Sequence, residues 1–397
     1  MVNELACTAR EKALLAVVLV GVLLLGAGCA SKQTAAPGAP EPLKVGAILS
    51  LTGPYAALGA SEKQALELEV KRVNEAGGVA GRKLDLIIED DATDEAKAVA
   101  AASKLIEQDK VIAILGATGT GQSMAIRNEV DRAGIPQLSM AGGTAITAKF
   151  DPQVFQTPWS NTIVVPFVVD AMASDGHKKI GVLSDSSGYG KDGLAVILTA
   201  APKAGVTVVA DQTFNPGDTD FSAQLTKIKN SGADSVLLWT AGKEGAAIVK
   251  AARDLGIKVP LYGGSGQAKL EFAKGAGPAA EGFVFGTGKS LVPSNWGAGT
   301  AEFTVVDEFS KRYTQAYGEA PDIFAGHAFD ALAILQDALT RTGGNAEPAA
   351  LTKAVEETKG LTGFGGVFTF SEKNHNGLTT QDLALYRVVN GVWEPVK

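Results

Sequence analysis

A glycine-rich loop in this chain has almost the spacing of a nucleotide-binding motif. The apolar run at 111–116 leads into GATGTGQS, which fits G-x-x-x-x-G-K-S/T except that Gln122 replaces the lysine. A strand, a glycine-rich turn and a helix aim backbone N–H groups and the positive end of a helix dipole at one point, so the loop suits an anion. Because the lysine is missing, we expect an anion other than a nucleotide. The alternative is a plain tight turn whose hydroxyls cap the helix.

Other loops carry polar or aromatic residues directly after predicted strands, where ligands collect in open α/β sheets. These positions are Tyr55 in LSLTGPYAALG, Gly142, Gly143 and Thr144 in SMAGGTA, Tyr189 in SGYGKDG, Trp239 in LLWTAG and Ser265 in YGGSG. Each position also has a plainer structural interpretation as a turn, a helix cap or a packing residue.

Catalytic and metal-binding patterns are weak. The histidines His177, His327 and His375 do not have the spacing of a metal site. The stretch around Ser265 fails the G-x-S-x-G pattern because Gln267 stands where glycine is required. We therefore expect no enzyme activity, no catalytic residue, no metal and no cofactor. A secreted hydrolase that uses Ser265 and a histidine is the rival hypothesis.

The N-terminus has the features of an export signal. Arg10 and Lys12 precede an uncharged apolar run that ends in LLGAGC, which resembles a bacterial lipobox although Gly26 replaces the usual leucine. We expect a lipoprotein signal peptide at 1–28. We expect the segment 29–42 to consist of a lipidated Cys29 followed by a flexible, proline-rich tether. An uncleaved membrane anchor is the alternative.

Composition limits the possible partners and the number of domains. The chain has 397 residues, which suits two lobes, and a formal net charge of −7 with no basic tract. That balance argues against nucleic acid or anionic lipid as a partner. The only cysteines are Cys7 and Cys29, so no disulfide is expected after export.

Strand-like runs alternate with helical patterns in two successive rounds. The first round begins at LKVGAILSL (43–51) and the second at KKIGVLSDSS (178–187), and long helices follow residue 300. Such alternation predicts an α/β fold with two doubly wound parallel-sheet lobes. The final segments, GVFTFSEK and LALYRVVNGVWEPV, are expected to pair as a hairpin, with a turn at Asn390-Gly391.

The ordered set LSLTGPYAALG, DDATDEAKAVAAASKLI, GYGKDG and DTDFSAQLTKIKNSGADSVLL resembles the type I periplasmic binding proteins, in particular the branched-chain amino-acid receptors of ABC importers. The resemblance runs from Pro42 to the C-terminus. It implies three chain crossings between the lobes, with 43–160 plus 289–365 in one lobe and 161–288 plus 366–397 in the other. It also implies a monomer outside the cytoplasm, in the periplasm or on the outer face of the envelope, that delivers a small carboxylate ligand to a membrane permease by hinge closure.

The resemblance assigns roles to the candidate residues. The ligand carboxylate would bind the glycine-rich loop, and the SMAGGTA loop would contact the substituents of the ligand's α-carbon. Tyr189 would close over the ligand from the second lobe. The full set of expected ligand-binding residues is Tyr55, Thr118, Thr120, Gly121, Ser123, Gly142, Gly143, Thr144, Tyr189, Trp239, Ser265 and Phe324.

One departure from the family bears on the ligand. The amino-acid receptors have a glutamate for the ligand's ammonium group near the position of Ser265. Either another acid, such as Asp185 or Glu244, takes this role, or the ligand is an amine-free organic or aromatic acid. A ligand sensor of the same fold, acting on a membrane signalling protein, is a further alternative.

Overall fold

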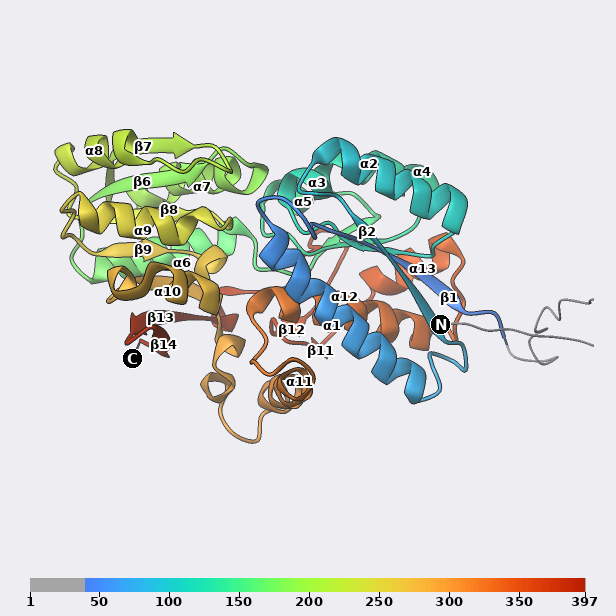
Figure 1. Ribbon diagram of the computed structural model, residues 1–397. Helices are drawn as coiled ribbons and strands as arrows, with labels where there is room; N and C mark the ends of the chain where they lie inside the picture. The colour runs from blue at the N-terminus through green and yellow to red at the C-terminus, as the bar shows by residue number, and fades with distance from the viewer. Residues whose placement is uncertain (1–39, 397) are drawn as a thin grey trace, which may run out of the picture. The chain divides into compact units, whose positions relative to one another are not determined.

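The computed structural model describes residues 40–396. The predicted signal peptide, Cys29 and nearly all of the predicted tether lie outside these residues. The described chain forms two α/β lobes, each built on its own sheet (Figure 1). This confirms the predicted fold class of two lobes with doubly wound parallel sheets.

A five-stranded parallel sheet with the order β2-β1-β3-β4-β5 forms the centre of the first lobe. Six of the seven residues of β1, LKVGAIL, are buried, as expected for a strand that helices cover on both faces. Because β1 has β2 on one side and β3 on the other, a crevice is expected at the carboxyl ends of β1 and β3. The strands are β1 (Leu43–Leu49), β2 (Leu84–Asp90), β3 (Ile114–Gly116), β4 (Gln137–Ser139) and β5 (Val154–Gln156).

Helices cover both faces of this sheet. One face packs on α1 and α12, and the other packs on α2 and α4. Leu43, Val45, Ala47 and Leu49 of β1 belong to the first apolar cluster, and Ile48 belongs to the second. The helices of this lobe are α1 (Ala56–Glu75), α2 (Glu95–Lys104), α3 (Thr120–Ala125), α4 (Arg127–Ala133), α5 (Ala145–Ala148), α11 (Ala301–Tyr317), α12 (Ile323–Arg341) and α13 (Pro348–Glu356).

The second lobe contains a seven-stranded sheet in the order β14-β13-β10-β9-β8-β6-β7. The five strands β10, β9, β8, β6 and β7 run parallel to one another. At the β10 edge, β13 and then β14 are added in antiparallel orientation. The strands of this sheet are β6 (Lys179–Asp185), β7 (Thr207–Phe214), β8 (Ser235–Trp239), β9 (Leu261–Gly263), β10 (Val284–Gly288), β13 (Leu383–Val389) and β14 (Val392–Pro395).

One face of this second sheet packs on α6 and α7 and the other on α8, α9 and α10 (Figure 1). As in the first lobe, the first strand, β6, lies between two others, so the carboxyl ends of β6 and β8 form the matching crevice. The helices are α6 (Asn161–Ser174), α7 (Gly188–Lys203), α8 (Ser222–Asn230), α9 (Glu244–Asp254) and α10 (Leu270–Ala276).

The chain passes between the lobes after β5, after β10 and again before β13. The exact lobe boundaries stay a prediction. Beyond the expected boundary at 365/366, the His375 Nδ1 atom still lies 2.9 Å from the Val154 oxygen of β5. The segment that leads to β13 therefore contacts the first lobe before it enters the second.

The C-terminal hairpin differs in part from the expectation. β13 and β14 pair around Asn390 and Gly391, which have φ of 52° and 79°, the left-handed conformation that a tight hairpin turn requires. The strand within GVFTFSEK does not join them. Instead, β12 (Val367–Phe368) pairs with β11 (Leu361–Thr362) because a tight turn, closed by a 2.8 Å bond from Gly363 N–H to the Gly366 oxygen, brings these two segments together first.

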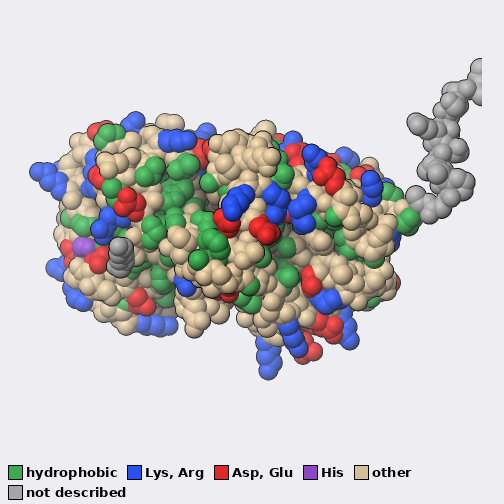
Figure 2. Space-filling view, turned by 90° about the horizontal axis from the view of Figure 1, so that it is seen from below, with side chains coloured by type: hydrophobic (Ala, Val, Ile, Leu, Met, Phe, Trp, Pro, Cys, Tyr) green, Lys and Arg blue, Asp and Glu red, His purple; other side chains and the backbone are tan. Residues whose placement is uncertain are grey.

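The described surface mixes charges of both signs. On the face that Figure 2 shows, Lys and Arg side chains are intermixed with Asp and Glu side chains. Within residues 40–396, no helix has both the length and the apolar character that a bilayer-spanning segment needs.

Candidate ligand-binding cavity

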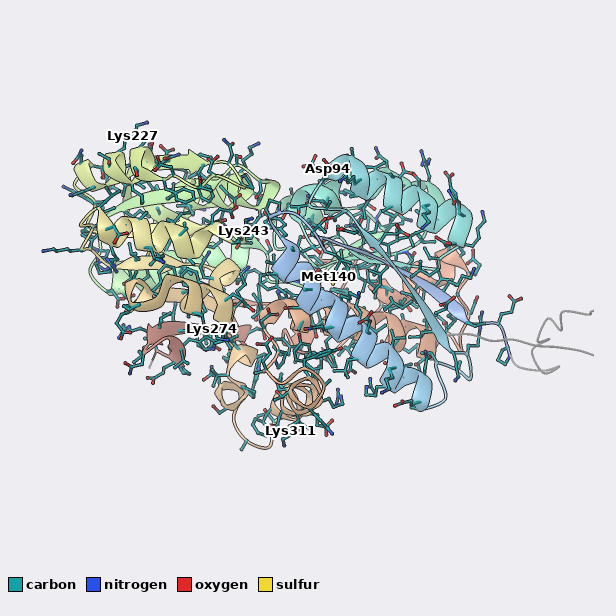
Figure 3. All side chains as sticks on the ribbon, in the orientation of Figure 1. Asp94, Met140, Lys227, Lys243, Lys274 and Lys311 are labelled. Atoms are coloured by element: carbon teal, nitrogen blue, oxygen red, sulfur yellow. The ribbon has the colours of Figure 1, made fainter. Side chains whose placement is uncertain are left out.

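A cavity lies where loops at the carboxyl ends of strands from both lobes meet. Its empty space, with the open solvent at its mouth included, is about 480 Å³. Met140, labelled in Figure 3, is one of its lining residues. The lining consists of Tyr55, Leu58, Thr118, Gly119, Thr120, Met140, Ala141, Gly142, Pro158, Trp159, Tyr189, Ala241, Ser265, Gly266, Ile323, Phe324 and His327.

The hydroxyl of Thr118 is already engaged within the first lobe. It accepts a 3.0 Å hydrogen bond from the backbone N–H of Ser50 and donates to the carboxyl of Glu62. Burial raises the pKa of Glu62 well above its usual value, and the bond from Thr118 only partly opposes this. Thr118 therefore holds the loop against β1 and α1.

Four lining residues have buried polar atoms that lack a hydrogen-bond partner among the described residues. These atoms are Tyr55 Oη, Thr120 Oγ1, Trp159 Nε1 and His327 Nδ1. Burial lowers the pKa of His327 to about 3, so its imidazole is neutral at neutral pH. Because buried polar groups are nearly always paired, these atoms mark the cavity as a place for a polar ligand.

Aromatic rings form much of the wall. Tyr189, at the start of α7, lies parallel to Trp239 with ring centroids 5.9 Å apart, so Trp239 supports it from behind. On the other side, the His327 ring meets Trp159 edge-on at 5.4 Å and Phe324 edge-on at 6.1 Å. These flat walls suit an apolar or aromatic ligand body.

Among residues 40–396, no Asp or Glu lines the cavity. Ser265 lines the cavity, and its hydroxyl donates a 3.4 Å bond to the Gly286 oxygen. The two acids considered as substitutes for the family glutamate have protein partners. Asp185 accepts a 2.6 Å bond from the Thr240 hydroxyl, and Glu244 accepts a 2.8 Å bond from the Gly217 N–H.

Seven expected binding residues line this cavity, namely Tyr55, Thr118, Thr120, Gly142, Tyr189, Ser265 and Phe324. The other five lie behind or beside it. Gly143 packs on Thr120, and Thr144 N–H donates to Asp192 in a 2.7 Å bond.

The remaining expected residues contact other protein groups, either within one lobe or across the two lobes. Ser123 shares a 2.8 Å hydroxyl bond with Ser139 inside the first lobe, and Gly121 lies against Gly188 of α7. Trp239 reaches the cavity only through Tyr189. A direct contact of these residues with ligand stays a prediction.

The sequence reasoning missed Trp159, whose unpartnered Nε1 belongs to the lining. It follows β5 in the stretch QTPWS. The rule that selected the other loops, a polar or aromatic residue just after a strand, would also have selected this one.

Residues 40–396 form neither a hydrogen-bonded pair of Ser265 with a histidine nor a cluster of metal-binding side chains. Ser265 and His327 line the same cavity, yet no hydrogen bond joins them among residues 40–396. Within the same range, no group of three or more His, Cys, Asp and Glu residues could hold a metal ion. The arrangement is suited to holding a small molecule between two lobes.

Residues 42–392 match the sequence profile of the family described as "Periplasmic binding protein". The chain belongs to this family. It is 29% identical over 333 residues to the Leu/Ile/Val-binding protein homolog 3 of Brucella melitensis, covering 83% of this chain and 87% of the relative. These matches confirm the resemblance seen in the sequence.

Solved structures of this periplasmic binding protein fold include relatives with different ligands. One is the branched-chain amino acid transporter substrate binding protein LivJ of Streptococcus pneumoniae in complex with isoleucine, with a TM-score of 0.78, 26% identity, and coverage of 89% of this chain and 99% of that one. Another is an ABC transporter solute binding protein of R. palustris in complex with benzoate, with a TM-score of 0.80, 25% identity, and coverage of 89% and 95%.

Proposed function

We propose that this periplasmic binding protein is the substrate receptor of an ABC importer and that its ligand is a small carboxylate without an ammonium group, with an apolar or aromatic body. The observation that carries the proposal is the lining: aromatic walls and four unpartnered polar atoms, with no acidic side chain from residues 40–396. The importer role rests on the family and on the relatives' names.

An ammonium group in this cavity would lack a direct counter-charge. Removing an ion from water costs several kcal/mol unless a partner of opposite charge and good geometry replaces the water. The two candidates, Asp185 and Glu244, are not lining residues and already accept hydrogen bonds from other protein groups, with Glu244 Oε2 left without a partner among the described residues. An amine-free acid avoids this cost.

The carboxylate end is assigned to the first lobe. The Thr120 hydroxyl is buried and has no described partner, and it follows Gly119 in the loop that joins β3 to α3. A hydroxyl donor in such a loop suits a carboxylate oxygen. Tyr189 from the second lobe then covers the opposite face of the ligand.

A branched-chain amino acid is the second candidate because relatives are named for leucine, isoleucine and valine, and one solved relative holds isoleucine. It requires Asp185 or Glu244 to turn toward the cavity. The relative that holds benzoate supports the first candidate. An amine-free acid remains the ligand class that the lining fits better.

Matched ligands separate the two candidates. We would titrate the purified protein by calorimetry with leucine and with 4-methylpentanoate, which is leucine without its amine, and with phenylalanine and 3-phenylpropanoate. At least one amine-free acid should bind about tenfold more tightly than its amino acid, since each 1.4 kcal/mol changes affinity tenfold. Tighter binding of the amino acid in both pairs would overturn the ligand assignment.

Thr120→Val tests the carboxylate end. Loss of a hydrogen bond to a charged group should weaken binding of the amine-free acids about 10- to 150-fold. The matched control is Thr340→Val, on the exposed side of α12, which should bind like the wild type. Equal affinity of the wild type and Thr120→Val would place the carboxylate elsewhere.

A further inference from the structure

A lysine lies buried directly behind the cavity wall. Lys269 precedes α10 and is only 4% exposed. Its Nζ donates a 3.3 Å hydrogen bond to the Ala241 oxygen and lies 5.7 Å from the centre of the Phe324 ring. Both contacted residues line the cavity, Ala241 from the second lobe and Phe324 from the first.

The charge of Lys269 is poorly compensated. An ammonium group has three N–H donors, and the Ala241 oxygen is the one acceptor found for them within residues 40–396. No described carboxylate oxygen lies within 4.0 Å of Nζ. Burial lowers the pKa of Lys269, and the more distant Asp322, Glu271 and Glu244 oppose this only in part.

The carboxyl groups around Lys269 do not turn to it. Asp322 accepts a 2.9 Å bond from the Ser61 hydroxyl and another from its own helix, and Glu244 accepts the bond from Gly217. Glu271 is exposed. A buried ammonium with spare donors is costly unless an acceptor meets it.

We infer that Lys269 recognises an acceptor oxygen at the end of the ligand remote from its carboxylate. Lys269 follows the lining residues Ser265 and Gly266 in the second lobe and lies behind the lining residues Ala241 and Phe324, whereas Thr120 belongs to the first lobe. A ligand held between the lobes would present one oxygen group to each. The ligand class is thereby narrowed to carboxylates with a keto group or a second carboxylate. This inference rests on the proposed function.

Two ligand series of constant skeleton test the inference. One is pentanoate, 4-oxopentanoate and glutarate, and the other is benzoate, 4-acetylbenzoate and terephthalate. In at least one series, the keto acid or the dicarboxylate should bind about 10- to 150-fold more tightly than the simple acid, as for a hydrogen bond to a charged group. If only the keto acid binds more tightly, the preferred acceptor on the ligand is neutral. If only the dicarboxylate binds more tightly, the preferred acceptor is charged.

Lys269→Met should abolish this preference and leave the affinity for pentanoate and benzoate within about twofold, while Lys269→Arg should retain part of it. The control is Lys274→Met, an exposed position on α10 labelled in Figure 3. A structural defect would weaken all ligands together, so the ratio within a series reports on recognition.

The inference is overturned if the second oxygen gives no gain in either series, or if Lys269→Met weakens all members equally. Its failure is distinct from that of the proposed function. If 4-methylpentanoate binds more tightly than leucine but the second oxygen adds nothing, only the inference is lost. If the amino acid binds more tightly in both pairs, both are lost.

Discussion

At the scale of single residues, burial keeps His327 neutral and thereby makes its effect on stability depend on pH. Its pKa falls from 6.5 to about 3 in the folded protein. Between pH 6.5 and pH 3, the unfolded chain therefore binds a proton at His327 that the folded chain does not. The contribution of His327 to the free energy of unfolding is fully present above pH 6.5 and is lost progressively as the pH falls toward 3. His327→Gln removes this contribution.

Urea unfolding of the ligand-free wild type and His327→Gln at pH 7.5 and pH 5.0 measures this effect. The wild type should lose about 2 kcal/mol more of its free energy of unfolding than the variant over this interval. The raised pKa of Asp322, about 6, acts in the opposite direction, but in both proteins alike. Parallel pH curves would show that His327 titrates normally in the folded state.

At the scale of secondary-structure elements, α7 connects the lobes through Asp192. One carboxylate oxygen accepts 2.7 Å hydrogen bonds from the Thr144 N–H of the first lobe and from Asn161 Nδ2 at the start of α6. Nearby, a Cβ on Gly188 would lie 2.9 Å from the Gly121 nitrogen, so the two lobes approach closely here. We expect the ligand-bound arrangement of the two lobes to depend on this contact.

Asp192→Ala should therefore weaken binding of the amine-free acids about tenfold, because the loss of a charge-assisted bond of about 1.5 kcal/mol shifts the lobes toward an open state. Small-angle scattering with saturating ligand, together with calorimetry, measures both effects. The control is Asp170→Ala on the exposed side of α6. Unchanged affinity and an unchanged radius of gyration would show that closure does not use Asp192.

At the scale of the whole molecule, the N-terminal sequence predicts where the protein resides. We propose that Cys29, outside the described residues, carries a lipid anchor, because it ends the apolar run in LLGAGC. When the protein is expressed in bacteria, the wild type should partition into the detergent phase of a Triton X-114 extraction, and Cys29→Ser into the aqueous phase. Detergent partitioning of both, with residues 1–28 retained by mass spectrometry, would favour an uncleaved anchor.

The sequence by itself determined the fold class and most loop positions. Apolar runs such as LKVGAIL and the helices between them are local patterns, and local patterns fix which segments become strands and which become helices. Tyr55, Thr120 and Tyr189 could be selected because residues after parallel strands meet at one edge of a sheet.

Only the tertiary structure decided which polar atoms remain available at that edge. Thr118 and Thr120 are two residues apart, yet Glu62 from another helix engages the first and leaves the second unpartnered. The burial of Lys269 against Phe324 joins segments of both lobes. Such partners come from distant parts of the chain, so no local pattern encodes them; the packing of the lobes determines them.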